Sequence, residues 1–123
     1  MVGRSLVVGR PAALLLDRAN ATVTVCHSRT QDLAAVCRQG DILVAALGRA
    51  QALRSECFRA GQVVVDVGIH VGADGKLCGD ICQEDALQAD LAFTPVPGGV
   101  GAVTTAILAL HVAQAAQSAS NSD

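Results

Sequence analysis

Apolar and polar positions along the chain alternate between short β-branched runs and longer stretches with helical spacing. The runs of strand length are Ala21–Cys26, Ile42–Ala46 and Val63–Val67. The stretches with helical spacing are Arg10–Ala19, Gln31–Arg38 and roughly Leu53–Phe58. The last two runs are apolar on both faces, which is typical of buried parallel strands, and the alternation of strands with helices indicates βαβ units. The pattern therefore predicts an α/β fold with a doubly wound parallel sheet.

The pattern becomes less regular after Gly68. Asp74-Gly75 predicts a turn, with a small hairpin around it. A short helix is expected over Gln83–Ala89 and a last short strand over Leu91–Phe93.

A proline- and glycine-rich loop, Thr94–Gly101, precedes the last helical stretch. Its two prolines fix φ and its three glycines allow backbone geometry that other residues avoid. A helix is predicted over Ala102–Gln117, and the polar tail Ser118–Asp123 is expected to fray. We therefore expect one domain over residues 1–117, followed by a short polar tail.

Composition adds a constraint on the surface. The 123 residues suit a single domain. Hydrophobic residues make up 51% of the chain and charged residues 16%, whereas charged residues make up about 25% of an average domain. We therefore expect a partner to cover part of the surface. The net charge of −2 gives no reason to expect nucleic acid or an anionic membrane as that partner.

The apolar excess does not by itself predict a membrane protein. The longest apolar stretch, Ala102–Ala116, is shorter than the roughly 20 residues that a span needs, and the first residues lack the pattern of a signal peptide. The five cysteines form no CxxC pair and no complete set of zinc ligands. We expect reduced thiols that fill the core, no metal, and a cytoplasmic location.

Candidate chemistry begins at the turn Gly3–Pro11, which lies between a strand stub and the first helix. An α/β domain binds phosphate at this position, because glycine lets backbone amides approach the oxygens and the helix N-terminus adds its positive dipole end. Pro11 suits the opening turn of a helix, where a missing N–H costs nothing. The spacing is not GxGxxG, so the turn alone leaves a plain strand–helix connection as an equal alternative.

The end of the second predicted strand favours NADP over NAD. An NAD site carries an acidic residue about 20 residues past the glycines, which binds the ribose 2′-hydroxyl. Here the chain reads Cys26-His27-Ser28-Arg29-Thr30, and no carboxylate occurs before Asp32. Ser28, Arg29 and Arg4 offer donors that suit a 2′-phosphate better. The alternative for Arg29 is a solvated loop arginine.

Several motifs occur along the chain at characteristic intervals. They are Gly3-Arg4-Ser5 with Val8-Gly9 and Pro11, then Ala21-Thr22-Val23-Thr24 with Cys26-His27-Ser28 and Thr30, then Asp66-Val67-Gly68-Ile69, Gly79-Asp80, and Thr94-Pro95-Val96-Pro97-Gly98-Gly99-Val100-Gly101. In this order they resemble the methylenetetrahydrofolate dehydrogenase/methenyltetrahydrofolate cyclohydrolase family. The resemblance covers nearly the whole chain, and its last motif is highly specific.

The resemblance implies a Rossmann-type cofactor domain that works beside an N-terminal catalytic domain, with folate in the cleft between them. It implies hydride transfer from 5,10-methylenetetrahydrofolate to NADP, followed by hydrolysis to 10-formyltetrahydrofolate, within one-carbon metabolism and purine biosynthesis. By the same analogy the cofactor-binding residues are Gly3, Arg4, Ser5, Val8, Gly9, Pro11, His27, Ser28, Arg29, Gly48 and Ile69. The loop residues that face the substrate are Pro97, Gly98, Gly99 and Gly101.

The chain departs from the family pattern in several respects. The family's acid/base pair is a lysine and a tyrosine of the N-terminal half, but this chain has no tyrosine, and its lone lysine, Lys76, matches no motif position. We therefore expect no catalytic residue and no N-terminal domain here. Ala102-Val103-Thr104 replaces the usual Pro-Met-Thr. Only Met1 and Val2 precede Gly3, so the first strand is expected to be truncated.

These observations leave three hypotheses for function. The chain is the cofactor half of a folate enzyme that works with a separate catalytic half, or an NADP-binding module without chemistry, or a remnant that self-associates as a homodimer. In each case the isolated chain is expected to be inactive, and folate is expected to bind only with a catalytic domain.

Overall fold

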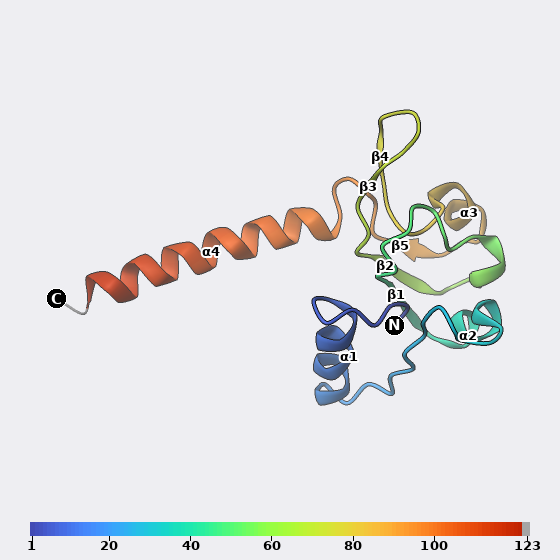
Figure 1. Cartoon of the computed structure of the whole chain (residues 1–123), viewed down its shortest axis with the longest axis horizontal. Coiled ribbons are helices and arrows are strands. Elements are labelled where there is room, and N and C mark those ends of the chain that lie inside the picture. The colour runs from blue at the N-terminus through green and yellow to red at the C-terminus, as the bar shows by residue number, and fades with distance from the viewer. Residues whose placement is uncertain (122–123) are drawn as a thin grey trace.

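Figure 1 shows a body of short strands and helices, from which one long helix projects. It is a computed structural model that describes residues 1–121. The helices are α1 (Gly9–Arg18), α2 (Leu33–Gln39), the 3-10 turn η1 (Ser55–Cys57), α3 (Gln83–Gln88) and α4 (Val100–Ser120). The strands are β1 (Ile42–Ala45), β2 (Val63–Asp66), β3 (His70–Val71), β4 (Leu77–Cys78) and β5 (Ala92–Phe93).

The main sheet is parallel and has the order β1-β2-β5. Val2 extends it beyond β1 through single parallel bridges to Ala45 and Cys26. All pairs within this sheet are parallel, and helices lie between its strands along the chain, so the predicted α/β fold of Rossmann type is confirmed, with the first strand reduced to the bridges of Val2. The predicted hairpin around Asp74-Gly75 is also confirmed, since β3 and β4 pair antiparallel on either side of it.

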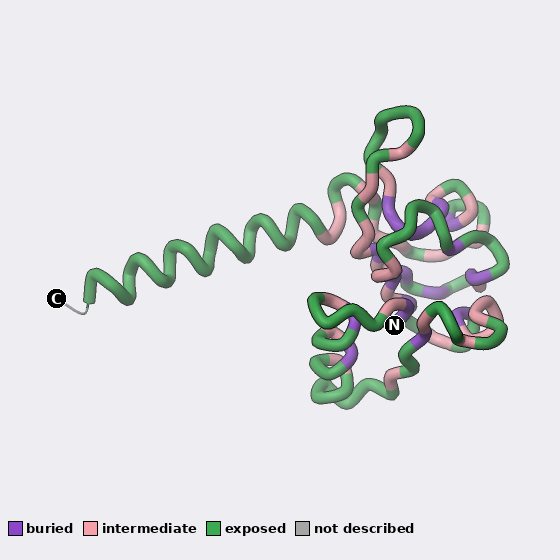
Figure 2. Tube along the Cα trace, viewed as in Figure 1, coloured by how far each residue is buried: buried purple, intermediate pink, exposed green. Residues whose placement is uncertain are grey.

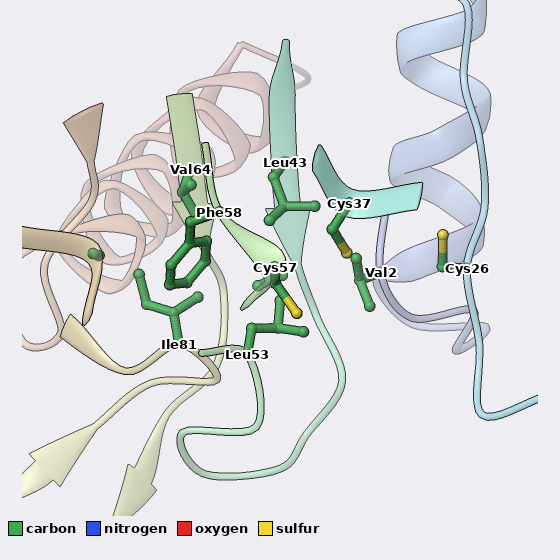
Figure 3. Packing of buried hydrophobic residues seen from close by; sticks show 11 residues of the cluster. Val2, Cys26, Cys37, Leu43, Leu53, Cys57, Phe58, Val64 and Ile81 are labelled. Carbon is green, nitrogen blue, oxygen red and sulfur yellow. The ribbon is translucent and has the colours of Figure 1, made fainter. Parts of the chain in front are cut away.

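Most of the predicted helices and strands occur within two residues of their expected bounds. The core forms where two predicted strands, β1 and β2, face the loops that follow them. Leu43 and Val64 pack with Leu53, Phe58 and Ile81 in one buried cluster (Figure 3). Burying each of these side chains stabilises the fold by about 1.5–3 kcal/mol. The cluster therefore holds the loops after β1 and β2 against the sheet.

The predicted strand Ala21–Cys26 is wrong for most of its length. Among these residues only Cys26 pairs with another strand, and Ala21, Thr22, Thr24 and Val25 are exposed. The physical reason is that β propensity needs a neighbour to pack against. The one neighbour of this segment is the short strand at Val2, which reaches no further than Met1.

The predicted helix Leu53–Phe58 is also wrong, apart from the single turn η1. Leu53 instead forms a parallel bridge to Ile81, with the Leu53 amide donating to Asp80 and the Cys82 amide donating to Leu53. Tertiary pairing therefore overrides the helical pattern, because it buries the Leu53 side chain completely.

The last helix, α4, leaves the body and buries none of its residues (Figure 2). It begins two residues before and ends three residues after the predicted bounds, so the expected fraying does not apply to Ser118–Ser120. Ser122 and Asp123, which complete the expected tail, lie outside the described residues. Apolar side chains cover the helix on several sides and are half or more exposed, among them Val103, Leu108 and Val112.

The expectation that the last apolar segment is too short for a membrane span is corrected by the helix length. With 21 residues and no charged side chain, α4 is long and apolar enough to cross a bilayer by length and composition alone. The helix is longer than the apolar stretch because it also includes Val100 and Gly101 at its start and the more polar residues Gln117–Ser120 at its end.

Candidate cofactor site

The turn from Gly3 to Gly9 is folded tightly against the end of β1. Gly3 has a φ of +119°, which favours glycine, and a Cβ there would collide with the carbonyl of Ala46. A Cβ on Gly9 would collide with the backbone of Gly3. Both glycines are therefore needed for the backbone to close on itself between the first strand and α1.

Ser5 holds the entrance of α1. Its Oγ accepts hydrogen bonds from the amides of Val8 at 3.1 Å and Gly9 at 3.3 Å, and its carbonyl accepts one from Arg10 at 3.0 Å. Arg4 and Ser5 are exposed, and within residues 1–121 their own amides have no partner. The turn thus presents unpaired backbone donors beside a helix N-terminus, which is the arrangement that binds phosphate.

A second loop, His27–Thr30, lies next to this turn, because the Gly3 amide donates to the Cys26 carbonyl at 2.9 Å. The loop is held by its own side chains: the Thr30 hydroxyl accepts from the His27 amide at 2.8 Å, and His27 Nδ1 accepts from the Arg29 amide at 3.2 Å. Ser28 and Arg29 are left exposed at the tip. Their side chains are thus available for a ligand that reaches beyond the glycine turn.

A cavity of about 260 Å³ opens between the glycine turn and the ends of β1 and β2. Its lining residues are Ser5, Val8, Ala46, Leu47, Gly48, Val67, Gly68, Ile69, His70 and Asp80. Four of the residues expected to bind the cofactor, Ser5, Val8, Gly48 and Ile69, are therefore brought together. Ligands of open α/β sheets bind at this edge, outside the carboxyl ends of the strands.

The other expected residues lie around this cavity or away from it. Gly3 and Gly9 form the backbone of the turn, and Arg4 and Pro11 are exposed beside it. His27, Ser28 and Arg29 occupy the neighbouring loop. None of the expected substrate-side residues lines the cavity; they are Pro97, Gly98, Gly99 and Gly101.

Two buried aspartates, Asp66 and Asp80, shape the cavity, and neither is among the residues expected to bind the cofactor. The Asp80 carboxylate accepts three successive amides, Leu47 at 2.5 Å, Gly48 at 3.1 Å and Arg49 at 2.9 Å. Its Oδ1 also lies 2.8 Å from Nε2 of His70, which lines the cavity as well. One carboxylate therefore fixes both the Gly48 loop and the imidazole beside it.

Asp66, at the end of β2, holds Asp80 in turn. Its carboxylate accepts the amides of Gly68 at 2.9 Å, Asp80 at 3.0 Å and Ile81 at 3.0 Å. A Cβ on Gly79 would collide with the Asp66 carboxylate, and one on Gly68 would press on Asp80 at 2.5 Å. The sequence signal for this arrangement is the pairing of each aspartate with a nearby glycine.

The proline- and glycine-rich loop is anchored to the same network. The Thr94 hydroxyl accepts the Asp66 amide at 2.9 Å, and the Gln83 side chain donates to the Val96 carbonyl at 2.9 Å. The Val96–Pro97 peptide is cis, and Gly98 has a φ of +101°. The loop is therefore fixed to β2 at its first residue, Thr94, and continues into α4 at its other end.

Four of the five cysteines are buried as expected, whereas Cys78 is only partly buried in the β3–β4 hairpin, and none of the five lines the cavity. All five are free thiols, and the residues that the structure describes contain no group of three or more His, Cys, Asp or Glu that could hold a metal ion. A hydrogen bond between Cys37 and Cys57 lowers the pKa of Cys57 to about 7 and raises the pKa of Cys37.

The geometry described above defines a dinucleotide-binding α/β domain, with a phosphate turn, a neighbouring polar loop and a cavity at the strand ends. A family profile described as the NAD(P)-binding domain of tetrahydrofolate dehydrogenase/cyclohydrolase matches residues 1–120. The chain therefore belongs to the tetrahydrofolate dehydrogenase/cyclohydrolase family and corresponds to its NAD(P)-binding domain, as the motif resemblance predicts.

Individual relatives agree with this assignment. The chain is 54% identical over 119 residues to the bifunctional protein FolD of Carboxydothermus hydrogenoformans, covering 95% of this chain and 42% of that protein. It is 56% identical over 117 residues to FolD 1 of Rubrobacter xylanophilus, covering 95% and 41%. The chain thus spans about two fifths of the length of these relatives.

Solved structures show the same relationship. The 5,10-methylenetetrahydrofolate dehydrogenase of the silkworm Bombyx mori matches with a TM-score of 0.83 and 36% identity, over 98% of this chain and 44% of that chain. The dehydrogenase-cyclohydrolase of Trypanosoma brucei, solved with NADP cofactor and an inhibitor, matches with a TM-score of 0.72 and 42% identity, over 84% and 37%.

Proposed function

We propose that this chain binds NADP and forms the cofactor half of a methylenetetrahydrofolate dehydrogenase/methenyltetrahydrofolate cyclohydrolase. The observation that carries the proposal is the cavity at the strand ends, where Ser5, Gly48 and Ile69 meet. The T. brucei relative, which was solved with NADP cofactor, supports the same cofactor. When bound, NADP supplies the carbon that accepts the hydride; the chain's own residues bind and orient it.

The neighbouring loop supports NADP over NAD. Ser28 and Arg29 are exposed donors beside the glycine turn. The nearest carboxylate that follows them, Asp32, already accepts a backbone hydrogen bond. Asp32 Oδ1 accepts the Ala35 amide at 3.1 Å and so caps α2. A cofactor whose ribose carries a 2′-phosphate therefore meets positive charge here and no free carboxylate. Gly3, Arg4, Val8, Gly9, Pro11 and His27 are proposed to complete the cofactor contacts.

The polar groups of the cavity suit positioning better than proton transfer. Hydride transfer needs orientation but no side-chain acid, whereas the cyclohydrolase step needs acid/base assistance. Lys76 lies in the exposed hairpin, 3.8 Å from Asp74, and it does not line the cavity. The acid/base groups are therefore proposed to come from a catalytic half outside these 123 residues, and the isolated chain is proposed to be inactive.

The substrate is proposed to reach the cofactor between that catalytic half and the loop that contains Pro97, Gly98, Gly99 and Gly101. The exposed apolar surface of α4 supports this arrangement, because a monomer rarely leaves such a surface in water. The catalytic half is proposed as its partner, in a cytoplasmic enzyme of one-carbon metabolism that serves purine biosynthesis.

A second candidate function is NADP binding without chemistry, with α4 covered by another copy of the chain. The same exposure of α4 supports it. The two candidates differ in solution: a self-associating module forms dimers that persist on dilution and gains no activity from a separately expressed catalytic half. A cofactor half gains dehydrogenase activity in that mixture.

The cofactor itself is tested by calorimetric titration of the purified chain with NADP and with NAD. We expect tighter binding of NADP; equal affinity, or a preference for NAD, would contradict the proposal. The proposed inactivity of the isolated chain is tested by adding 5,10-methylenetetrahydrofolate and NADP and following the absorbance of NADPH. Turnover by the isolated chain would contradict the proposal that it is inactive.

A further inference from the structure

The cofactor cavity contains one side-chain acceptor that no group of the described residues 1–121 uses. Three of the lining residues have polar side chains, namely Ser5, His70 and Asp80. Ser5 Oγ already accepts two amides at the start of α1. Both Asp80 oxygens are occupied by three backbone amides and the His70 ring. The acceptor that remains is Nδ1 of His70.

The contact with Asp80 determines which ring nitrogen of His70 carries the proton. Nε2 of His70 lies 2.8 Å from Oδ1 of Asp80. A carboxylate that receives several backbone amides acts as an acceptor, so Nε2 donates to it, and the neutral imidazole keeps its lone pair on Nδ1. His70 therefore offers an acceptor to a ligand in the cavity.

The His70 ring is held in position by both its backbone and its side chain. His70 is the first residue of β3 and pairs with Cys78, at the base of the hairpin that projects from the body (Figure 1). Its side chain is 21% exposed, whereas the side chain of its partner, Asp80, is completely buried. An acceptor that is already fixed loses little conformational freedom when a ligand binds, which favours a specific contact.

The place of the cavity beside the glycine turn indicates which half of the cofactor it receives. On one flank of the turn the Gly3 amide donates to the Cys26 carbonyl, where the His27–Thr30 loop begins. On the other flank the turn lies against Ala46, which lines the cavity. The pyrophosphate of a dinucleotide sits at such a turn, so the two nucleosides lie on opposite flanks. Because the adenosine with its 2′-phosphate is proposed to meet the loop, the cavity receives the nicotinamide half.

The size and the lining of the cavity suit that half. Its volume of about 260 Å³ is below the roughly 300–1,000 Å³ of pockets that enclose a whole ligand of drug size. Val8, Val67 and Ile69 supply apolar surface for an aromatic ring. The ribose is joined to the pyrophosphate and lies nearer Ser5, so the carboxamide is the polar group that reaches further into the cavity. Its amino group is a donor and needs an acceptor.

We propose that Nδ1 of His70 accepts a hydrogen bond from the carboxamide amino group of the nicotinamide. This contact makes His70 a specificity-determining residue for the nicotinamide end, because it fixes the rotation of the ring about its bond to ribose. The inference rests on the proposed binding of NADP. It adds a residue to those that the motif resemblance assigns to the cofactor.

The first experiment compares NADP with its 3-acetylpyridine analogue, in which a methyl group replaces the amino group of the carboxamide. Calorimetric titration of the 123-residue chain is expected to show about five-fold to ten-fold tighter binding of NADP, as for one hydrogen bond. His70→Ala is expected to bind the two ligands with affinities within about two-fold of each other, because the acceptor is gone.

Two further variants separate this contact from a general effect on the fold. His70→Gln keeps a donor for Asp80 and an acceptor for the ligand, so it is expected to retain a preference for NADP of at least about three-fold. His111→Ala, at an exposed position of α4, is the matched control and is expected to keep the whole preference.

The ratio of the two affinities decides the outcome, because damage to the fold lowers both affinities together. A ratio in His70→Ala that equals the ratio of the unmodified chain would overturn the proposal. Failure of the unmodified chain to bind either ligand would instead contradict the proposed NADP function on which the inference rests.

Nuclear magnetic resonance of nitrogen-labelled histidines tests the same contact without a substitution. The chain has three histidines, His27, His70 and His111, and the resonance of an unprotonated ring nitrogen moves when that nitrogen accepts a hydrogen bond. We expect NADP to shift Nδ1 of His70, and 2′-phospho-ADP-ribose, which lacks the nicotinamide ring, to leave it unchanged. His27, in the loop proposed to meet the adenosine half, is expected to respond to both ligands, and His111 to neither.

The pattern of these shifts distinguishes the carboxamide from the ribose. A His70 resonance that responds equally to both ligands would assign Nδ1 to a ribose hydroxyl and overturn the proposal. A His70 resonance that responds to neither ligand, while His27 responds to both, would also overturn it, and the proposed binding of NADP would still stand.

Discussion

The carboxylate of Asp66 accepts the backbone amide of Asp80 at 3.0 Å, so one buried aspartate fixes the position of another. Both side chains are completely buried. Asp66 is the last residue of β2, and the Asp80 carboxylate accepts the three backbone amides that follow Ala46, just after β1. The pair therefore joins two strand ends that are distant in sequence, and the cofactor cavity lies between the loops it holds.

Replacing Asp80 by Asn is expected to destabilise the domain and to weaken cofactor binding. In the native protein both oxygens of the Asp80 carboxylate accept backbone amides. Asparagine replaces one oxygen by an NH₂ group, which cannot accept, so at least one buried donor is left unpaired, at a cost of about 1–3 kcal/mol. Urea unfolding measures the stability, and titration with NADP measures the affinity.

Asp74→Asn is the matched control, because Asp74 is exposed at the hairpin tip. It is expected to change the free energy of unfolding by less than about 0.5 kcal/mol. A similar loss in both variants would mean that Asp80 has no special structural role.

Gly79→Ala is expected to disrupt the same network from the backbone side. Its Cβ would collide with the Asp66 carboxylate, which is itself held by three amides and cannot move aside. We expect a loss of about 2 kcal/mol or more in the free energy of unfolding, as for overpacking in a core.

Gly101→Ala provides the comparison. A Cβ there meets nothing within 4 Å, and the residue lies in α4, where alanine favours helix by about 1 kcal/mol over glycine. Thermal unfolding of Gly101→Ala should therefore show no loss of Tm. Equal losses in the two variants would contradict the assigned clash.

Strand prediction from the sequence succeeds where the partner of a strand lies inside the chain. Ile42–Ala45 and Val63–Asp66 are apolar runs that pair with each other, so pattern and structure agree. Ala21–Cys26 has an equally good pattern but lacks a full-length neighbour, and it stays irregular. The helix predicted over Leu53–Phe58 is wrong for the opposite reason: Leu53 finds a strand partner, Ile81, that the local helical pattern does not reveal.

The candidate site is predicted in part for a similar reason. The glycine turn is a local feature, so its position follows from spacing, and Ser5, Gly48 and Ile69 do meet at one cavity. The role of Asp80 depends on contacts with residues 31 to 33 positions away in the chain. No local pattern contains that information, although the neighbouring glycines mark the close approach.

Arg29→Ala is expected to lower the affinity for NADP by about ten-fold, as for loss of one charge-assisted hydrogen bond. The affinity for NAD should stay within about two-fold, because NAD lacks the 2′-phosphate. Calorimetric titration with both cofactors checks this. Arg18→Ala, at an exposed position in the last turn of α1, is the control for a general loss of positive charge.

An unchanged ratio of NADP to NAD affinity in Arg29→Ala would mean that the Arg29 side chain stays in solvent and does not contact the 2′-phosphate. In that case Ser28 is the remaining donor at the loop tip, and Ser28→Ala becomes the variant that discriminates between the cofactors.

Removing residues 102–123 is expected to leave the stability of the body almost unchanged. No residue of α4 is buried, so the deletion removes little apolar contact with the body. We expect a shift in Tm of less than about 3 °C, which corresponds to well under 1 kcal/mol for a domain of this size. The truncated chain should also self-associate less, because the exposed side chains of Val103, Ile107, Leu108, Leu110 and Val112 are gone. Thermal unfolding and light scattering measure the two effects. A large fall in Tm would show that α4 packs on the body in solution, and unchanged self-association would show that another surface is responsible for it.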